Sequence, residues 1–170
     1  MHENFERIYD QHFDGVYRFV LFKTGDRWVT DDLVSEIFRK VFQRIDVIGT
    51  LAPDQCKPWL MTVSRNTVID YYRRKKEYPY GHDPEVYGYS KVELSFTDSD
   101  PRNDCLEQSL RALTSEEREL MNLKFVVGLK YAEIGEIVGK EESWLKSKAH
   151  RIKGKMSVFI NRCMGVKNDG

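Results

Sequence analysis

Apolar side chains recur every three or four positions through most of the chain, a pattern typical of amphipathic helices that bury one face. The first such stretch covers about residues 3–23 and has as its apolar members Phe5, Ile8, Tyr9, Phe13, Val16, Tyr17 and Val20. Thr24-Gly25-Asp26 interrupts the pattern, because glycine and aspartate favour turns. The pattern therefore predicts a first helix that ends near residue 23.

A second apolar stripe follows and predicts a helix that begins at Thr30, with Thr30 as the N-cap and Asp31 and Asp32 in the positively polarised first turn. The stripe consists of Leu33, Val34, Ile37, Phe38, Val41, Phe42 and Ile45. The opposite, polar face carries Asp32, Ser35, Glu36, Arg39, Lys40 and Gln43. Residues 47–57 form a looser segment.

The third helix is expected to run from Trp59 through Tyr72, with Pro58 at its first position, where the missing N–H costs little. We expect Trp59 to belong to the core, since large aromatic side chains are usually buried. This helix ends in the basic run Arg73-Arg74-Lys75-Lys76.

The helical period returns in the last third of the chain. Leu106, Leu110 and Leu113 predict a short helix, and Thr114 with Glu117 forms the pattern of a capping box that opens the next one. A helix over Tyr131–Val138 should end at Gly139, and a last helix should start near Glu141. With no strand pattern in the sequence, the predicted fold class is all-α, with two small helical domains at residues 1–76 and 105–170.

Charge is distributed unevenly although the formal net charge is zero, with 27 basic and 27 acidic side chains. Residues 77–104 hold two basic and seven acidic side chains and several prolines and glycines, so we expect a flexible acidic linker there. A second basic cluster follows the linker, on the last helix: Lys146, Lys148, Arg151, Lys153 and Lys155. Two basic faces suggest a polyanion bound at two places, although solvated helix surfaces would have the same composition.

Several classes of protein are disfavoured. No apolar run approaches the roughly 20 residues of a membrane span, and the N-terminus lacks the order of a secretory signal, so we expect a soluble, cytoplasmic protein. Cys56, Cys105 and Cys163 are odd in number and form no CxxC pair, which disfavours both a disulfide framework and a zinc site and favours reduced thiols. Because no nucleophile, base and orienting group form a set, we expect no enzyme, no metal and no cofactor.

The segment Lys130–Gly139 and the basic helix after it have the pattern of a helix-turn-helix. Ala132 is small where the two helices would cross. In this arrangement the second helix lies in the DNA major groove, with Lys146, Ser147, Lys148 and Arg151 facing outward. An ordinary antiparallel helix pair with a charged surface would also fit this segment taken alone.

Taken together, the two halves resemble a known family. The resemblance is carried by the segments Leu33-Val34-Ser35-Glu36-Ile37-Phe38, Trp59-Leu60, Arg65-Asn66, Tyr131-Ala132-Glu133-Ile134 and Lys146-Ser147-Lys148. In order and spacing the chain is similar to a bacterial sigma factor of the extracytoplasmic-function (ECF) group, with residues 5–76 resembling region 2 and residues 106–156 resembling region 4.

The resemblance implies a promoter-specificity subunit that binds core RNA polymerase and promoter DNA and helps to open the −10 element. The polar face named above, Asp32, Ser35, Glu36, Arg39, Lys40 and Gln43, would contact the polymerase. Asn66 would read the −10 strand, Arg65, Arg73 and Arg74 would hold its backbone, and residues 47–57 would capture an extruded base. The duplex −35 element would be contacted by Lys146, Ser147, Lys148, His150 and Arg151, and an anti-sigma factor is an expected partner.

The recognition helix departs from the family pattern in two respects. Trp144 stands where a small residue usually begins the recognition motif, and lysines stand where arginine, which has a bidentate fork, is common. The alternatives are a stand-alone helix-turn-helix regulator whose first domain senses a ligand or dimerises, and a structural adaptor that uses both helical units for protein contacts.

Overall fold

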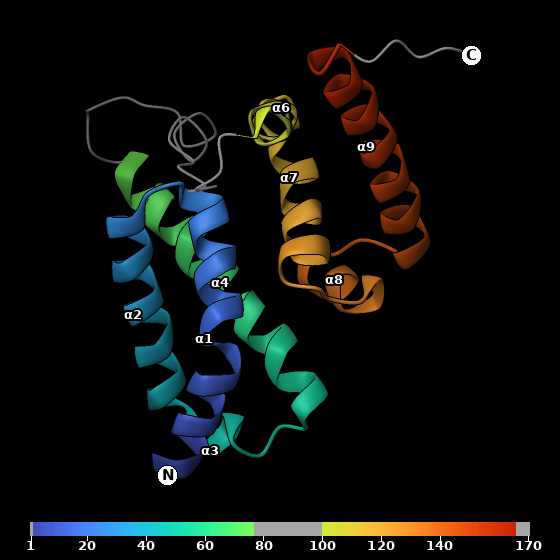
Figure 1. Cartoon of the computed structure of the whole chain (residues 1–170). Coiled ribbons are helices and arrows are strands. Elements are labelled where there is room, and N and C mark those ends of the chain that lie inside the picture. Colours follow the sequence, from blue (N-terminus) through green and yellow to red (C-terminus); the bar gives the residue numbers. More distant parts are fainter. Residues whose placement is uncertain (1, 77–99, 166–170) are drawn as a thin grey trace.

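The computed structural model describes residues 2–76 and 100–165, and every regular element in those two ranges is a helix. The first domain consists of α1 (His2–Thr24), α2 (Arg27–Gln43), the short α3 (Ile45–Ile48) and α4 (Pro53–Lys76). Helices α1, α2 and α4 contact one another and form a bundle (Figure 1). The predicted all-α class with two helical units is confirmed.

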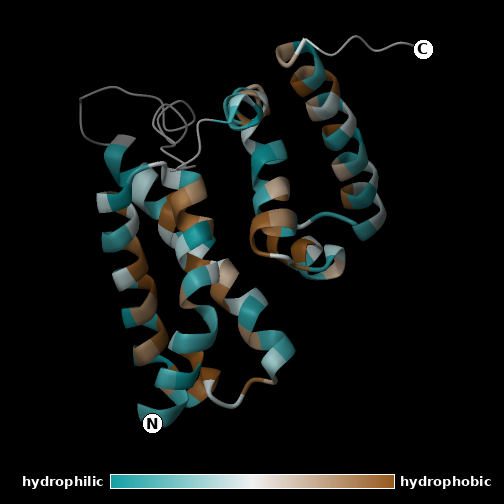
Figure 2. Ribbon diagram, in the orientation of Figure 1, coloured by the Kyte–Doolittle hydropathy of each residue, from teal (hydrophilic) through white to brown (hydrophobic). Residues whose placement is uncertain are grey.

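The second domain consists of α6 (Pro101–Arg111), α7 (Ser115–Met121), the π-helical turn η1 (Asn122–Val126), α8 (Tyr131–Val138) and α9 (Glu142–Cys163). Helix α9 contacts α6, α7 and α8, so the long last helix is the element against which the rest of the domain packs (Figure 1). Brown and teal bands alternate along the helices of both domains in Figure 2, as amphipathic sequences require.

Local signals placed several helix ends correctly. The capping box is formed, with the Thr114 hydroxyl accepting from the Glu117 N–H and the Glu117 carboxylate accepting from the Thr114 N–H. Helix α8 ends at Gly139, whose φ of 70° lies in the left-handed region that favours glycine.

Two predicted helix starts are wrong. Asp26, not Thr30, caps α2, because its carboxylate accepts from the N–H groups of Trp28 and Val29. Thr30 is buried inside the helix, where its hydroxyl donates to the Asp26 carbonyl oxygen. Similarly, α4 begins at Pro53 rather than at Trp59, so Pro58 lies within the helix.

The end of the predicted linker is helical. Asp100 caps α6 by accepting from the Arg102 N–H, and α6 starts at Pro101, within the segment expected to be linker. The rest of the predicted acidic linker, residues 77–99, lies outside the described residues.

The expectation of three reduced thiols is wrong for two of them. Cys105 of α6 and Cys163, the last residue of α9, form a disulfide, with Cα atoms 5.8 Å apart. They are 58 positions apart in sequence and meet because α6 packs along the end of α9. Cys56 is free and buried.

The close approach between α8 and the turn before α9 is made by Gly135, not by Ala132. Ala132 is exposed, whereas a Cβ added at Gly135 would lie 2.6 Å from the Lys140 carbonyl oxygen and 3.7 Å from a methyl group of Leu145. The sharp turn therefore depends on a glycine three residues further along the helix than expected.

The two domains pack against each other. Helix α1 contacts η1, α4 contacts α8, and the buried apolar residues of both domains belong to one continuous cluster. In Figure 1, α7 lies between α1 and α9. This arrangement brings cationic and acidic side chains of different domains together.

Candidate nucleic-acid and polymerase interfaces

The face of α9 predicted to meet duplex DNA is exposed. Leu145, Ala149 and Ile152 are each 1% exposed and anchor the opposite side of the helix in the core. The outward side carries Lys146, Ser147, His150 and Arg151, all exposed. Lys146 pairs with Glu142 at 2.9 Å, but such a solvent-exposed pair contributes little and leaves the lysine available.

Lys148 differs from the other predicted contacts on α9 because it is half buried. Its ammonium lies 3.6 Å from a carboxylate oxygen of Glu117 and 5.9 Å from the centre of the Trp144 ring. Glu117 also accepts from Lys155 at 3.2 Å. Burial raises the pKa of Glu117. The hydrogen bond from the Thr114 N–H and the charges of the two lysines together lower it by more, so the net pKa is below its ordinary value.

On α4 three of the four predicted contacts with the −10 strand are exposed: Asn66, Arg73 and Arg74. Arg73 lies 3.6 Å from Asp70 in an exposed pair. Three donors along one helix suit a single strand running past it, since phosphate contacts position the strand and an amide can pair with a base edge.

Arg65, the fourth predicted contact, is turned toward the second domain. Its Nε donates to Oε1 of Glu119 at 2.9 Å, and Lys23 of α1 donates to the same oxygen at 2.8 Å. Burial raises the pKa of Glu119, but the charges and hydrogen bonds of Lys23 and Arg65 outweigh it, so the net pKa is below its ordinary value. Arg65 therefore differs from the other three predicted contacts, because its guanidinium is bound to Glu119.

The polar face of α2 is largely accessible, as the prediction of a polymerase-binding surface requires. Asp32, Ser35, Arg39 and Gln43 are exposed. Glu36 and Lys40 are half buried and pair with each other at 2.9 Å, and Lys40 also donates to the Thr67 hydroxyl of α4 at 3.0 Å. Ser35, Glu36 and Arg39 line a surface depression together with Arg74, so the α2 face and the end of α4 adjoin.

The segment predicted to capture a base is shorter than expected, because residues 45–48 and 53–57 are helical. What remains is the turn at residues 49–52, between α3 and α4. Val47 projects beside this turn with 67% of its surface exposed, and Trp28 at the start of α2 is 83% exposed. Trp59 is half buried and packs on the core, in line with its predicted role.

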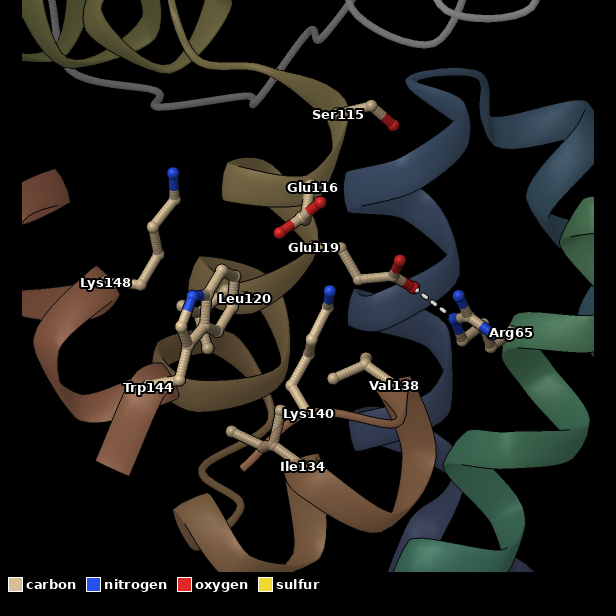
Figure 3. A pocket seen from close by; sticks show the side chains of 10 residues that line it. All are labelled: Arg65, Ser115, Glu116, Glu119, Leu120, Ile134, Val138, Lys140, Trp144 and Lys148. Carbon is tan, nitrogen blue, oxygen red and sulfur yellow. Dashed lines mark hydrogen bonds and ion pairs between the residues drawn. The ribbon is translucent and has the colours of Figure 1, made fainter. Parts of the chain in front are cut away.

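A cavity of about 330 Å³ is lined mainly by the second domain, with Arg65 of the first domain at its edge (Figure 3). Figure 3 shows Arg65 and Glu119 meeting at one side and Trp144 and Lys148 at the other. The Trp144 ring lies 5.1 Å from the Lys140 ammonium, so the cavity wall combines an aromatic ring with cations and acids.

The described residues contain no group of three histidine, cysteine or acidic side chains that could hold a metal ion. Likewise, none of the helices in the described ranges combines the length and hydropathy needed to cross a lipid bilayer.

Sequence reasoning missed the residues that join the domains. Glu119 is 96 positions from Lys23 and 54 from Arg65, and Asn122 reaches a carbonyl oxygen 103 positions away. No local spacing reports such contacts. One local signal pointed to Glu119. It is an acidic residue directly before Leu120, a buried position of α7, which indicates that its side chain lies near the edge of the core.

A helix-turn-helix with an exposed basic recognition face, joined to a helical bundle with a second row of cations, defines a DNA-binding transcription protein of two domains. Comparison with known families agrees: residues 8–78 match Sigma-70 region 2 and residues 103–156 match Sigma-70, region 4. The chain belongs to the sigma-70 family of RNA polymerase sigma factors, in its extracytoplasmic-function (ECF) group.

Curated relatives are named in the same terms. The chain is 31% identical over 150 residues to the ECF RNA polymerase sigma factor BldN of Streptomyces coelicolor, covering 86% of this chain and 56% of that protein. It is 26% identical over 166 residues to the RNA polymerase sigma factor SigZ of Bacillus subtilis, covering 98% and 92%. It is 30% identical over 150 residues to the ECF sigma factor SigL of Mycobacterium tuberculosis, covering 84% and 81%.

Two solved structures share the fold. The sigma factor RpoE of Bartonella quintana, in complex with the anti-sigma factor NepR, superimposes with a TM-score of 0.68 at 18% identity, over 94% of this chain and 98% of that one. CnrH, in complex with the cytosolic domain of CnrY, gives 0.65 at 18% identity over 93% and 88%.

Proposed function

We propose that this sigma factor directs core RNA polymerase to its promoters through three surfaces, one on each of α2, α4 and α9. It acts as an initiation factor and not as an enzyme, in the cytoplasm where polymerase and promoter meet. The observation that carries the proposal is the α9 face, where an apolar side anchored in the core leaves a basic side free for the major groove.

The α9 face is proposed to read the −35 duplex. Lys146 and Arg151 can donate to guanine or to phosphate, and Ser147 and His150 add polar contacts. Lys148 contributes less, because Glu117 neutralises part of its charge. This difference within one helix separates base-reading residues from a residue that stabilises the domain.

The α4 row is proposed to hold the melted −10 strand. Arg73 and Arg74 would hold the backbone and Asn66 would face a base, while the turn at residues 49–52 receives the extruded base in place of the longer loop expected from the sequence. Arg65 joins this row once Glu119 releases it.

The mixed charges of the α2 face are proposed to bind a coiled coil of core polymerase. Charges of both signs along one helix suit steering and register. Residues Ser35, Glu36 and Arg39 lie beside Arg74, so polymerase binding and strand binding would adjoin on this surface.

An anti-sigma factor is proposed as a further partner. Support comes from the similarity in fold to RpoE, whose solved structure holds the anti-sigma factor NepR. An inhibitor would act by covering one or more of the three surfaces.

The test is reconstitution with core polymerase, followed by transcription across a genomic library to find a promoter. On that promoter Arg151→Ala should lower transcription about tenfold, since a lost base or phosphate contact costs about 1–3 kcal/mol. Arg162→Ala is the matched control, because it removes an exposed arginine from the far end of the same helix and should leave transcription unchanged.

Failure of the chain to bind core polymerase would overturn the proposal. Tight duplex binding without polymerase would favour the stand-alone regulator instead. Equal loss in Arg151→Ala and Arg162→Ala would show that general charge, not the recognition face, determines binding.

A further inference from the structure

The carboxylate of Glu119 joins the two domains through two ion pairs. Its Oε1 atom accepts from Lys23 of α1 at 2.8 Å and from Arg65 of α4 at 2.9 Å, while Glu119 itself belongs to α7 of the second domain. Its side chain is 16% exposed, so the ion pairs are shielded from salt more than surface pairs are. One carboxylate oxygen thus holds two helices of the other domain.

A second polar contact supports the first. Asn122 lies on the same side, one turn further along, and its amide nitrogen donates to the Phe19 carbonyl oxygen of α1 at 3.1 Å. The residue is 0% exposed, and its Oδ1 atom has no hydrogen-bond partner in the described part of the chain. A buried polar atom without a partner costs free energy. Separation of the domains would remove this cost, because water could then donate to the oxygen.

The domain contact therefore combines an apolar cluster with these polar contacts, and the unpartnered Asn122 oxygen carries a free-energy cost. Contacts of this kind separate more readily than an all-apolar interface of the same size, because the exposed groups regain hydration. The cavity adds to this, since it leaves open space beside the Glu119–Arg65 pair (Figure 3).

Arg65 takes part in this contact and is also the fourth member of the proposed strand-binding row on α4. It cannot serve both at once. A guanidinium binds a carboxylate and a phosphate through the same N–H groups, so Glu119 and a DNA phosphate are alternative occupants. Asn66, Arg73 and Arg74 on the same helix remain exposed. The row is therefore complete except for the member that the second domain holds.

We propose that Glu119 occupies, in the free chain, the position on Arg65 that a phosphate of the promoter strand takes during initiation. The inference rests on the proposed function and adds a switch to it. While Lys23 and Arg65 hold Glu119, the chain is closed and its strand-binding row is incomplete. Separation of the domains on the polymerase releases Arg65, and the free chain alone binds DNA weakly.

The experiment uses the full free chain and a fluorescein-labelled 20-nucleotide oligothymidine as the probe. Glu119→Gln should enlarge the radius of gyration in X-ray scattering and tighten probe binding by about tenfold. Glu116→Gln is the matched control, because it removes the same charge from an exposed residue of the same helix that also lines the cavity. It should leave both quantities close to wild type.

Lys23→Gln is the decisive variant, because it removes a positive charge without changing Arg65. The switch predicts that the probe binds about threefold more tightly, since the closed state is weakened. If Lys23 only attracted DNA through its charge, its loss would weaken probe binding instead. Far-UV circular dichroism and thermal unfolding establish that each variant is folded.

Weaker probe binding by Lys23→Gln, or equal behaviour of Glu119→Gln and Glu116→Gln, overturns the switch. Neither result affects the transcription test, which is made on the polymerase-bound chain. Conversely, if the variants open as predicted but the chain never binds polymerase, the Glu119–Arg65 contact is supported and the proposed function is overturned.

Discussion

The carboxyl group of Glu119 is subject to opposing influences on its pKa. Burial raises the pKa. The charges and hydrogen bonds of Lys23 and Arg65 together lower it by more, so the net pKa is below the ordinary 4.5. In an open chain Glu119 would be hydrated and would return to its ordinary pKa. The closed state therefore binds this proton less readily than the open state does.

The sign of the pH effect follows from that difference. Because its pKa is lowered, ionised Glu119 contributes its full stabilisation of the closed state above pH 4.5. This contribution is lost as the pH falls through the lowered pKa. X-ray scattering from pH 7 downward should show wild type expanding, while Glu119→Gln begins expanded and changes less. An identical pH profile for the two chains would contradict the assignment.

Single residues also show what sequence reasoning can and cannot find. Thr114 and Glu117 were identified correctly, because a capping box is contained within four consecutive residues. Thr30 was wrongly preferred to Asp26, since both are good N-caps and the exposed Trp28 hides the start of the apolar stripe. Glu119 was missed because its partners lie in the other domain.

At the level of helices, the 3.6-residue period was sufficient for α1 and α8, whose predicted ends lie close to the observed ones, and for the start of α9. Proline was less informative, since Pro53 and Pro58 both suit a helix start and the sequence gives no reason to choose the earlier one. The exposed face of α9 was predictable for the same reason as the helix, because burial on one side implies exposure on the other.

The turn between α8 and α9 depends on Gly135. Gly135→Ala would place a methyl group 2.6 Å from the Lys140 carbonyl oxygen, so the backbone must move and the second domain should lose about 1–3 kcal/mol of stability. Thermal or urea unfolding would measure the loss, and transcription should fall with it because the recognition helix is displaced.

Gly154→Ala is the matched control for this substitution. Gly154 lies within α9 with no atom within 4 Å of an added Cβ, so alanine should stabilise the helix by about 0.5–1 kcal/mol. If both alanine variants shift stability in the same direction, the close approach at Gly135 is not what limits the turn.

At the scale of the whole molecule, the sequence predicted two domains but not their mutual packing. The period of a helix shows which side is buried and not what covers it, so the contacts of α1 with η1 and of α4 with α8 were beyond its reach. The Cys105–Cys163 disulfide was missed for a related reason, because cysteine spacing says nothing about two helices packed side by side.

This disulfide closes a chain segment with a sequence separation of 58 and should stabilise the second domain by about 2–4 kcal/mol. Unfolding with and without dithiothreitol would measure the effect. The doubly substituted Cys105→Ser/Cys163→Ser chain should match reduced wild type and ignore the reductant. Unchanged unfolding of wild type on reduction would exclude a stabilising role.

The three indole rings occupy unlike surroundings, and this gives the molecule an intrinsic optical probe. Trp28 is largely in water, Trp59 packs on the first domain, and Trp144 borders the cavity that Arg65 of the first domain closes at one edge. Separation of the domains removes Arg65 from the wall of that cavity, which alters the environment of Trp144 and leaves the other two as they are. Emission from the native fluorophores thus reports the state of the chain without any added label.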